Sequence, residues 1–114
     1  MLSFVTLASG SSGNAALVSC GQTHILLDAG ISARRITTAL RGLGVDPASL
    51  SGVLITHEHT DHISGLATLT KQLSLPVYAT APTLDALAMK VPAIPEKRLG
   101  RFFAPGESFP LGEL

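Results

Sequence analysis

Short apolar runs separated by glycine and polar residues dominate the first thirty positions. Residues 2–7, 15–19 and 23–27 are each rich in strand-forming side chains and predict three short β-strands. Gly21-Gln22 fits a two-residue hairpin turn between the second and third strands. The composition of residues 9–14 predicts a loop after the first strand. This part of the chain therefore predicts an antiparallel meander.

The pattern changes period after residue 30. Ser32 is placed to cap a helix, and Ile36, Leu40 and Leu43 recur at the spacing of one helical face. The glycines within residues 42–44 are placed to end this helix. An aspartate followed by proline at residues 46–47 then predicts one further helical turn.

The second half alternates between strands and helices. An all-apolar run at residues 53–55 predicts a buried strand, and Thr80 is placed to cap a later helix. After residue 55, Ile63, Leu66, Leu69 and Leu73 mark a helix, and residues 76–79 a strand. The helix that begins at Thr80 runs to residue 90, with Leu84 and Leu87 on one face. The pattern then predicts a proline-rich connection at 91–95, a strand at 99–104, a turn at 105–106 and a further strand from 107. Strands first and alternation afterwards predict an α/β (α+β layered) domain with a mixed sheet.

Composition narrows the class of protein. Eight basic and eight acidic residues give a formal net charge of zero, so global charge does not favour a nucleic-acid or membrane partner. One cysteine, Cys20, excludes an intrachain disulfide framework and favours a reduced, cytoplasmic location. The N-terminus has no signal-peptide pattern, and no apolar run approaches the ~20 residues of a membrane span. Charged residues make up only 14%, which fits a fragment or a tight oligomer with uncovered apolar surface, or a chain that is simply rich in alanine and leucine.

Three of the four histidines fall within residues 57–62, directly after the buried strand predicted at 53–55. On an extended backbone His57, His59 and Asp61 point to one side, and a helix beginning near Asp61 would bring His62 beside them. Imidazole and carboxylate groups suit zinc, and also manganese or iron. These four side chains predict either one crowded metal site or two adjacent sites with two ligands each.

A metal site of this kind implies hydrolysis. Divalent metals lower the pKa of a coordinated water into the neutral range, and the water then attacks a carbonyl or phosphoryl centre. The helical His-Glu-x-x-His motif of metalloproteases does not fit, because Asp61 stands where its second histidine would be.

Three segments carry a resemblance to a known family. The pattern His57-x-His59-x-Asp61-His62 after an apolar strand resembles the signature of metallo-β-lactamase-fold hydrolases, and residues 26–30 (Leu-Leu-Asp-Ala-Gly) resemble the family's earlier Asp-x-Gly element. Residues 7–14 look like the opening loop of the bacterial YycJ/WalJ-type subfamily, which is associated with nuclease activity. The resemblance covers essentially the whole chain.

The resemblance implies roles for single residues. His57 and His59 would bind the first of two divalent metals, and Asp61 and His62 the second, with zinc as the expected metal and manganese or iron as alternatives. Asp61 would also be catalytic, handling protons at a bridging water. Asp28 would support the site from beside it, although aspartate also favours turns on its own account.

The resemblance also implies that the domain is incomplete. The family fold is an αββα sandwich of two similar halves, and residues 1–114 match the N-terminal half, a mixed sheet with helices on one face. We therefore expect a truncated metallo-β-lactamase-like domain whose uncovered sheet face allows self-association. Asp85 is expected on a solvated helix surface rather than as a metal bridge, His24 in a packing or edge role, and Cys20 in a structural role.

The expected activity of the full-length form is that of a dinuclear phosphodiesterase, a DNA or RNA exonuclease with a nucleic-acid substrate. The alternatives are an ester, thioester or lactam hydrolase on the same fold, or a catalytically inert half-domain. The loop residues Ser11, Ser12, Gly13 and Asn14 form either an anion- or substrate-binding loop or a plain turn. Two basic groups either contact phosphates or form solvated faces: Arg34, Arg35 and Arg41, and Lys97, Arg98 and Arg101.

Overall fold

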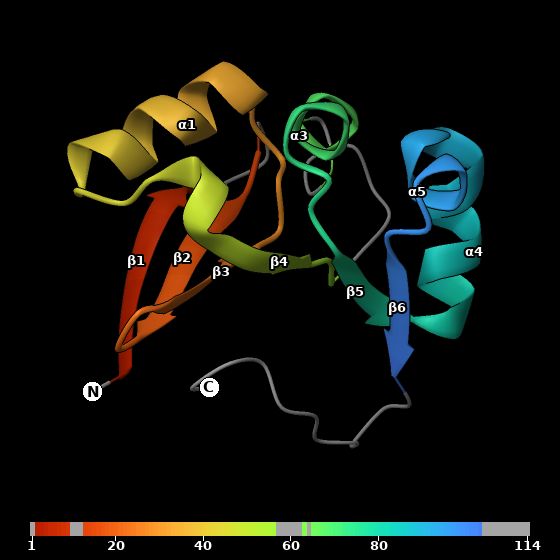
Figure 1. Ribbon diagram of the computed structural model, residues 1–114, viewed down its shortest axis with the longest axis horizontal. Coiled ribbons are helices and arrows are strands. Elements are labelled where there is room, and N and C mark those ends of the chain that lie inside the picture. Colours follow the sequence, from red (N-terminus) through yellow and green to blue (C-terminus); the bar gives the residue numbers. More distant parts are fainter. Residues whose placement is uncertain (1, 10–12, 57–62, 64, 104–114) are drawn as a thin grey trace.

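The computed structural model describes residues 2–9, 13–56, 63 and 65–103. In this part of the chain a mixed sheet curves beneath a set of helices (Figure 1). In chain order the elements are β1 (Leu2–Ala8), β2 (Ala15–Cys20), β3 (Thr23–Leu27), α1 (Ala33–Gly42), the 3₁₀-helix η1 (Pro47–Ser49), β4 (Leu50–Leu54), α3 (Leu66–Leu73), β5 (Val77–Thr80), α4 (Ala81–Lys90), α5 (Ala93–Glu96) and β6 (Gly100–Phe103).

The first three strands form the predicted antiparallel meander. Cys20 pairs with Thr23 across the hairpin, so Gly21 and Gln22 make its two-residue turn. Gly21 has a φ of 60°, a left-handed conformation that the favoured hairpin turns require and that glycine adopts without strain.

The pairs β3–β4, β4–β5 and β5–β6 are parallel. The strand order of the whole sheet is β1-β2-β3-β4-β5-β6. The carboxyl ends of β3, β4, β5 and β6 consequently lie at one end of the sheet. β1 is separated from β3 by two antiparallel pairings, so it runs in the same direction and also ends there. We call this the carboxyl end of the sheet. Loops from both halves of the described chain meet at it.

The helices α1, α3, α4 and α5 lie on one face of the sheet (Figure 1). The pairing register of the strands shows which sheet side chains lie beneath these helices. Leu26 pairs with Leu17 on one side and with Val53 on the other, and Val53 pairs with Val77, so these four share a face and are at most 4% exposed. Helix residues pack against this row, and the largest fully buried ones are Ile36, Leu40, Leu66, Leu69 and Leu87.

The opposite face is apolar but open in the described part of the chain. Phe4 pairs with Val18, and Val18 with Ile25, which places all three on this face. Phe4 is 60% exposed, while Val18 and Ile25 are half-buried. The ring of Tyr78 lies over Gly52, where an added Cβ would come within 2.8 Å of it. The predicted mixed sheet with helices on one face is confirmed.

The predicted helix caps are confirmed at two sites. Ser32 Oγ accepts a hydrogen bond from the N–H of Arg35 at 3.2 Å, and Asp46 Oδ1 accepts one from Ala48 at 3.0 Å. None of the described helices has the length and apolar character needed to cross a membrane.

Three expectations were wrong. Leu43 is 47% exposed rather than part of the buried stripe, because α1 ends at Gly42 and the chain turns at Gly44, with a φ of 77°. Residues 91–95 are not only a connection but contain the start of α5; Pro95 is tolerated there because the first helical turn needs no intrahelical N–H donors. The helix expected from Ile63 has a turn at Gly65 before α3 begins. The turn and strand expected from residue 105 lie outside the described residues.

Candidate functional site

Asp28 lies at the carboxyl end of β3, where the chain leaves the sheet. Its backbone N–H donates to the carbonyl of Leu54 at 2.8 Å, which extends the pairing with β4 by one residue. Its φ is 61°, in the left-handed region that aspartate and asparagine enter more readily than other residues with a side chain. The side chain is buried, at 6% exposed. This turn directs a buried carboxylate toward the end of the neighbouring strand.

The Asp28 carboxylate binds Thr56, two residues beyond the end of β4. Oδ1 accepts a hydrogen bond from the N–H of Thr56 at 2.8 Å. The Thr56 hydroxyl lies 2.8 Å from Oδ2 and 3.1 Å from Oδ1 and donates its proton to the same carboxylate. Hydrogen bonds to a charged acceptor are stronger than neutral ones. Asp28 therefore holds the backbone immediately before His57 in one position.

Ala29, the next residue of the same loop, bonds to the chain that follows residues 57–62, which we call the histidine segment. Gly65 donates its N–H to the carbonyl of Ala29 at 2.8 Å. A Cβ at position 65 would come within 2.2 Å of the Ile31 carbonyl oxygen, so only glycine allows this approach. Thr56 and Gly65 are thus bonded to the adjacent residues Asp28 and Ala29.

The loop before β2 joins the same assembly. The N–H of Gly30 donates to the carbonyl of Asn14 at 2.7 Å. A Cβ at Gly13 would come within 2.5 Å of the Gly30 carbonyl oxygen, so the two loops are in close contact. Of the predicted anion-binding loop, Gly13 and Asn14 are described and pack here, while Ser11 and Ser12 lie outside the described residues.

The predicted metal ligands His57, His59, Asp61 and His62 lie outside the described residues, so their assignment stays a prediction. Their donor set of three imidazoles and one carboxylate fits zinc. Among the residues that the structure describes, no three or more histidine, cysteine, aspartate or glutamate side chains gather into a cluster able to hold a metal ion. That part of the chain therefore offers no competing centre.

A hollow of about 220 Å³ opens beside Asp28 on the open face of the sheet. Phe4, Thr6 and Leu27 form part of its wall, and Asn14 and Asp28 stand at the carboxyl end. The hollow therefore offers both apolar and polar surface beside Asp28.

The other candidate side chains lie where they were expected. His24 is half-buried within the sheet, and its Nδ1 lies 2.6 Å from the hydroxyl of Ser19, which fits a packing role. Cys20 is a half-buried free thiol. Asp85 is exposed on α4, as predicted for a solvated surface residue.

Sequence reasoning missed the parts played by Thr56 and Gly65. Thr56 is 28 positions from Asp28, and their contact depends on the parallel register of β3 and β4. The only signal for Thr56 was a hydroxyl residue directly after a buried strand. For Gly65 the signal was a glycine inside an otherwise helical pattern, which commonly marks a close backbone approach.

Three comparisons relate this geometry to known proteins. A family model described as "Metallo-beta-lactamase superfamily" matches residues 8–113. The exodeoxyribonuclease YycJ of Bacillus anthracis is 39% identical over 94 residues, which cover 82% of this chain and 36% of the relative. The exodeoxyribonuclease WalJ of Streptococcus pneumoniae is 41% identical over 81 residues, covering 71% of this chain and 30% of the relative.

Solved structures extend the likeness to the fold. The crystal structure of the metallo-beta-lactamase SMB-1 with mercaptoacetic acid has a TM-score of 0.77 and 28% identity, and the match covers 99% of this chain and 47% of that one. The chain spans about a third of the length of the two exodeoxyribonucleases it matches.

Proposed function

This chain belongs to the metallo-beta-lactamase superfamily, and from that premise we propose that it forms part of a metal-dependent hydrolase that cleaves phosphodiester bonds in DNA. The site is the histidine segment at the carboxyl end of the sheet. His57 and His59 would hold one divalent ion, and Asp61 and His62 a second, with zinc as the preferred metal. The ions would supply an activated water and stabilise the attacking and leaving oxygens.

The observation that carries the proposal is the bonding of Asp28 to Thr56. A buried carboxylate in a left-handed turn accepts both the N–H and the hydroxyl of the residue before His57. Metal sites need their ligands held by surrounding hydrogen bonds. Asp28 bonds Thr56, the residue before the first proposed ligand, without being a proposed ligand itself. The names of the two exodeoxyribonuclease relatives support DNA as the substrate.

A substrate panel tests this function. Protein loaded with zinc or manganese is incubated with end-labelled DNA and RNA, and with carboxylic ester, thioester and lactam substrates. We expect release of nucleotides from DNA, abolished by His59→Ala and by Asp61→Ala. Turnover of an ester, thioester or lactam without nucleotide release would replace the nuclease with the carbonyl-hydrolase alternative, which the similarity to SMB-1 favours.

A second candidate is a non-catalytic half-domain that binds metal weakly and associates through the open sheet face. The observation that favours it is the exposure of Leu2 and Phe4, at 67% and 60%. Apolar groups of this size are seldom left in water on a sheet face. Light scattering distinguishes the candidates: a concentration-dependent dimer that Phe4→Lys converts to monomer, without any turnover in the panel, supports this one.

A further inference from the structure

We propose that Arg34 and Arg35 bind backbone phosphates of a nucleic-acid strand that extends from the metal centre along the hollow between β1 and α1. This inference rests on the proposed function, because it names a further contact of the same substrate. It assigns a role to two of the three arginines in the first basic group. It assigns none to Arg41 or to the second group.

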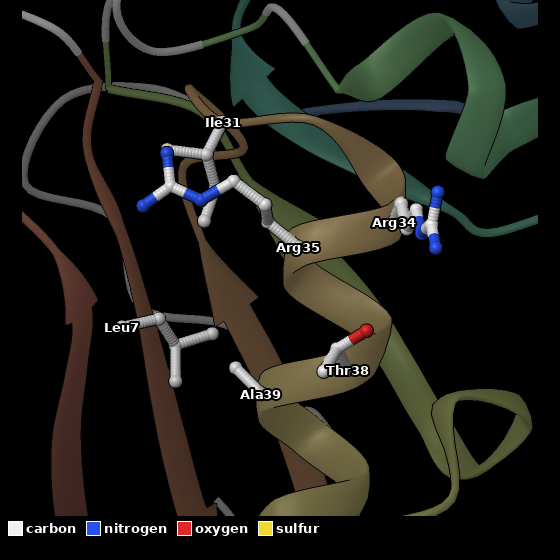
Figure 2. A pocket seen from close by; sticks show the side chains of 6 residues that line it. All are labelled: Leu7, Ile31, Arg34, Arg35, Thr38 and Ala39. Atoms are coloured by element: carbon white, nitrogen blue, oxygen red, sulfur yellow. The ribbon is translucent and has the colours of Figure 1, made fainter.

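The hollow has a volume of about 360 Å³ and lies between the end of β1 and the first turns of α1. Its lining is Leu7, Ile31, Arg34, Arg35, Thr38 and Ala39. In Figure 2 the Arg35 side chain extends beside Ile31, above Leu7, while Arg34 projects from the other side of the helix. The two guanidinium groups therefore flank the first turn of α1, with an apolar floor next to Arg35.

Neither guanidinium is neutralised within the described part of the chain. The described acidic side chains are Asp28, Asp46, Asp85 and Glu96, and none of them forms an ion pair or hydrogen bond with Arg34 or Arg35. Both arginines are exposed on the helix surface. Two unpaired guanidinium groups beside an open hollow suit phosphate, which arginine recognises with parallel N–H donors.

In the second basic group, Lys97 and Arg101 are engaged in hydrogen bonds to backbone carbonyls. Lys97 Nζ donates to the carbonyls of Thr70 and Lys71, at 3.1 and 2.6 Å, and so closes the end of α3. Arg101 donates to the carbonyls of Arg98 and Gly100, both at 2.9 Å.

The basic residues also differ in which end of the sheet or of α1 they occupy. Gly100 begins β6, so Arg98 and Arg101 lie at the amino end of the parallel strands, opposite the candidate site. Arg41 is in the last turn of α1, remote from its first turn. Among the arginines of the described chain, only Arg34 and Arg35 combine a position near the carboxyl end with guanidinium groups that bond no described residue.

The spacing fits a nucleic-acid strand. β1 and β4 are three strand positions apart, or about 14 Å at ~4.8 Å per strand. One strand of a B-form duplex carries a phosphate every ~3.4 Å along the helix axis, so a strand that follows the sheet end presents more than one phosphate over this distance. Ile31 lines the hollow and belongs to the loop that anchors the histidine segment through Asp28 and Ala29. Bound phosphate and metal centre would thus be held by one loop.

Binding of a fluorescent single-stranded oligonucleotide in EDTA tests the inference without any catalysis. Two lost phosphate contacts reduce the slope of log K against log salt by about 1.4 and weaken binding about 25-fold at 0.1 M salt. We expect both effects for the Arg34→Ala/Arg35→Ala double variant, measured by anisotropy. The Arg34→Lys/Arg35→Lys variant should retain most of the affinity, because it keeps the charge.

Arg41→Ala is the control for position, since it removes one arginine charge, against two in the double variant, from the last turn of the same helix. It should bind within about twofold of wild type. The inference is wrong if wild type does not bind the oligonucleotide, if the double alanine variant binds like wild type, or if Arg41→Ala weakens binding equally. Hydrolysis of the small diester bis(p-nitrophenyl) phosphate by the metal-loaded wild type should be measurable and tests the proposed function separately. Its absence in wild type would instead contradict the proposed function.

Discussion

Replacing Asp28 tests the anchoring of the histidine segment. Asp28→Ala removes two hydrogen bonds to a charged acceptor, each worth about 1.5 kcal/mol at the lower end of the range, because Thr56 is exposed and water can replace part of the loss. Alanine at a φ of 61° adds about 1 kcal/mol of backbone strain. We expect a loss of about 4 kcal/mol in the free energy of unfolding, out of a typical 5–15 kcal/mol.

Two further variants at position 28 separate the stability lost with the side-chain hydrogen bonds from the stability lost to backbone strain. Asp28→Gly loses the same hydrogen bonds without the left-handed strain, so it should cost about 3 kcal/mol. Asp28→Asn tolerates the left-handed turn and keeps an acceptor for the Thr56 N–H, so it should cost only about 1 kcal/mol. The order of stability is therefore wild type, Asn, Gly, Ala.

Urea denaturation followed by circular dichroism measures these differences. With a slope of ~1.5 kcal/mol per molar, Asp28→Ala should lower the midpoint by about 2–3 M. An alanine variant within about 1 kcal/mol of wild type would show that the Thr56 contact contributes little. An asparagine variant as unstable as alanine would show that charge, rather than shape and turn preference, dominates.

Glycine positions supply the remaining stability predictions, each checked by thermal melting. Gly65→Ala places a Cβ within 2.2 Å of the Ile31 carbonyl oxygen and should cost at least about 3 kcal/mol, and a loss below about 1 kcal/mol would contradict that close approach. Gly42→Ala should stabilise the chain by about 0.5–1 kcal/mol, because nothing lies within 4 Å of the new Cβ and the residue is helical. Gly44→Ala has equal space but a φ of 77°, so it should destabilise by about 1 kcal/mol, and stabilisation by both would refute the assigned turn.

Local sequence signals predicted most of the elements. The meander, the caps at Ser32 and Asp46, and the buried positions Ile36 and Leu40 depend on periodicity and on contacts between residues close in sequence. The short helix α5 escaped prediction because its prolines fit either a connection or a first helical turn.

The candidate site was predicted only in part, because its anchors join distant segments. The residue types at 57–62 indicate a metal site by themselves. In contrast, the contacts of Asp28 with Thr56 and of Ala29 with Gly65 depend on which strands are neighbours in the sheet. The same holds for the basic groups, which the sequence left open. In the described chain the contacts of Lys97 and Arg101 and the place of Arg41 in the last turn of α1 distinguish them from Arg34 and Arg35.

Zinc binding tests the central claim, that the histidine segment is a metal site, most directly. Equilibrium dialysis of zinc is compared for wild type, His57→Ala, His59→Ala and His24→Ala. His24 is the matched control, since it lies within the sheet beside Ser19 and outside the segment. We predict that His57→Ala and His59→Ala each weaken zinc binding by at least about tenfold, while His24→Ala binds like wild type. Equal binding by all four proteins, or loss of binding only in His24→Ala, would contradict the claim.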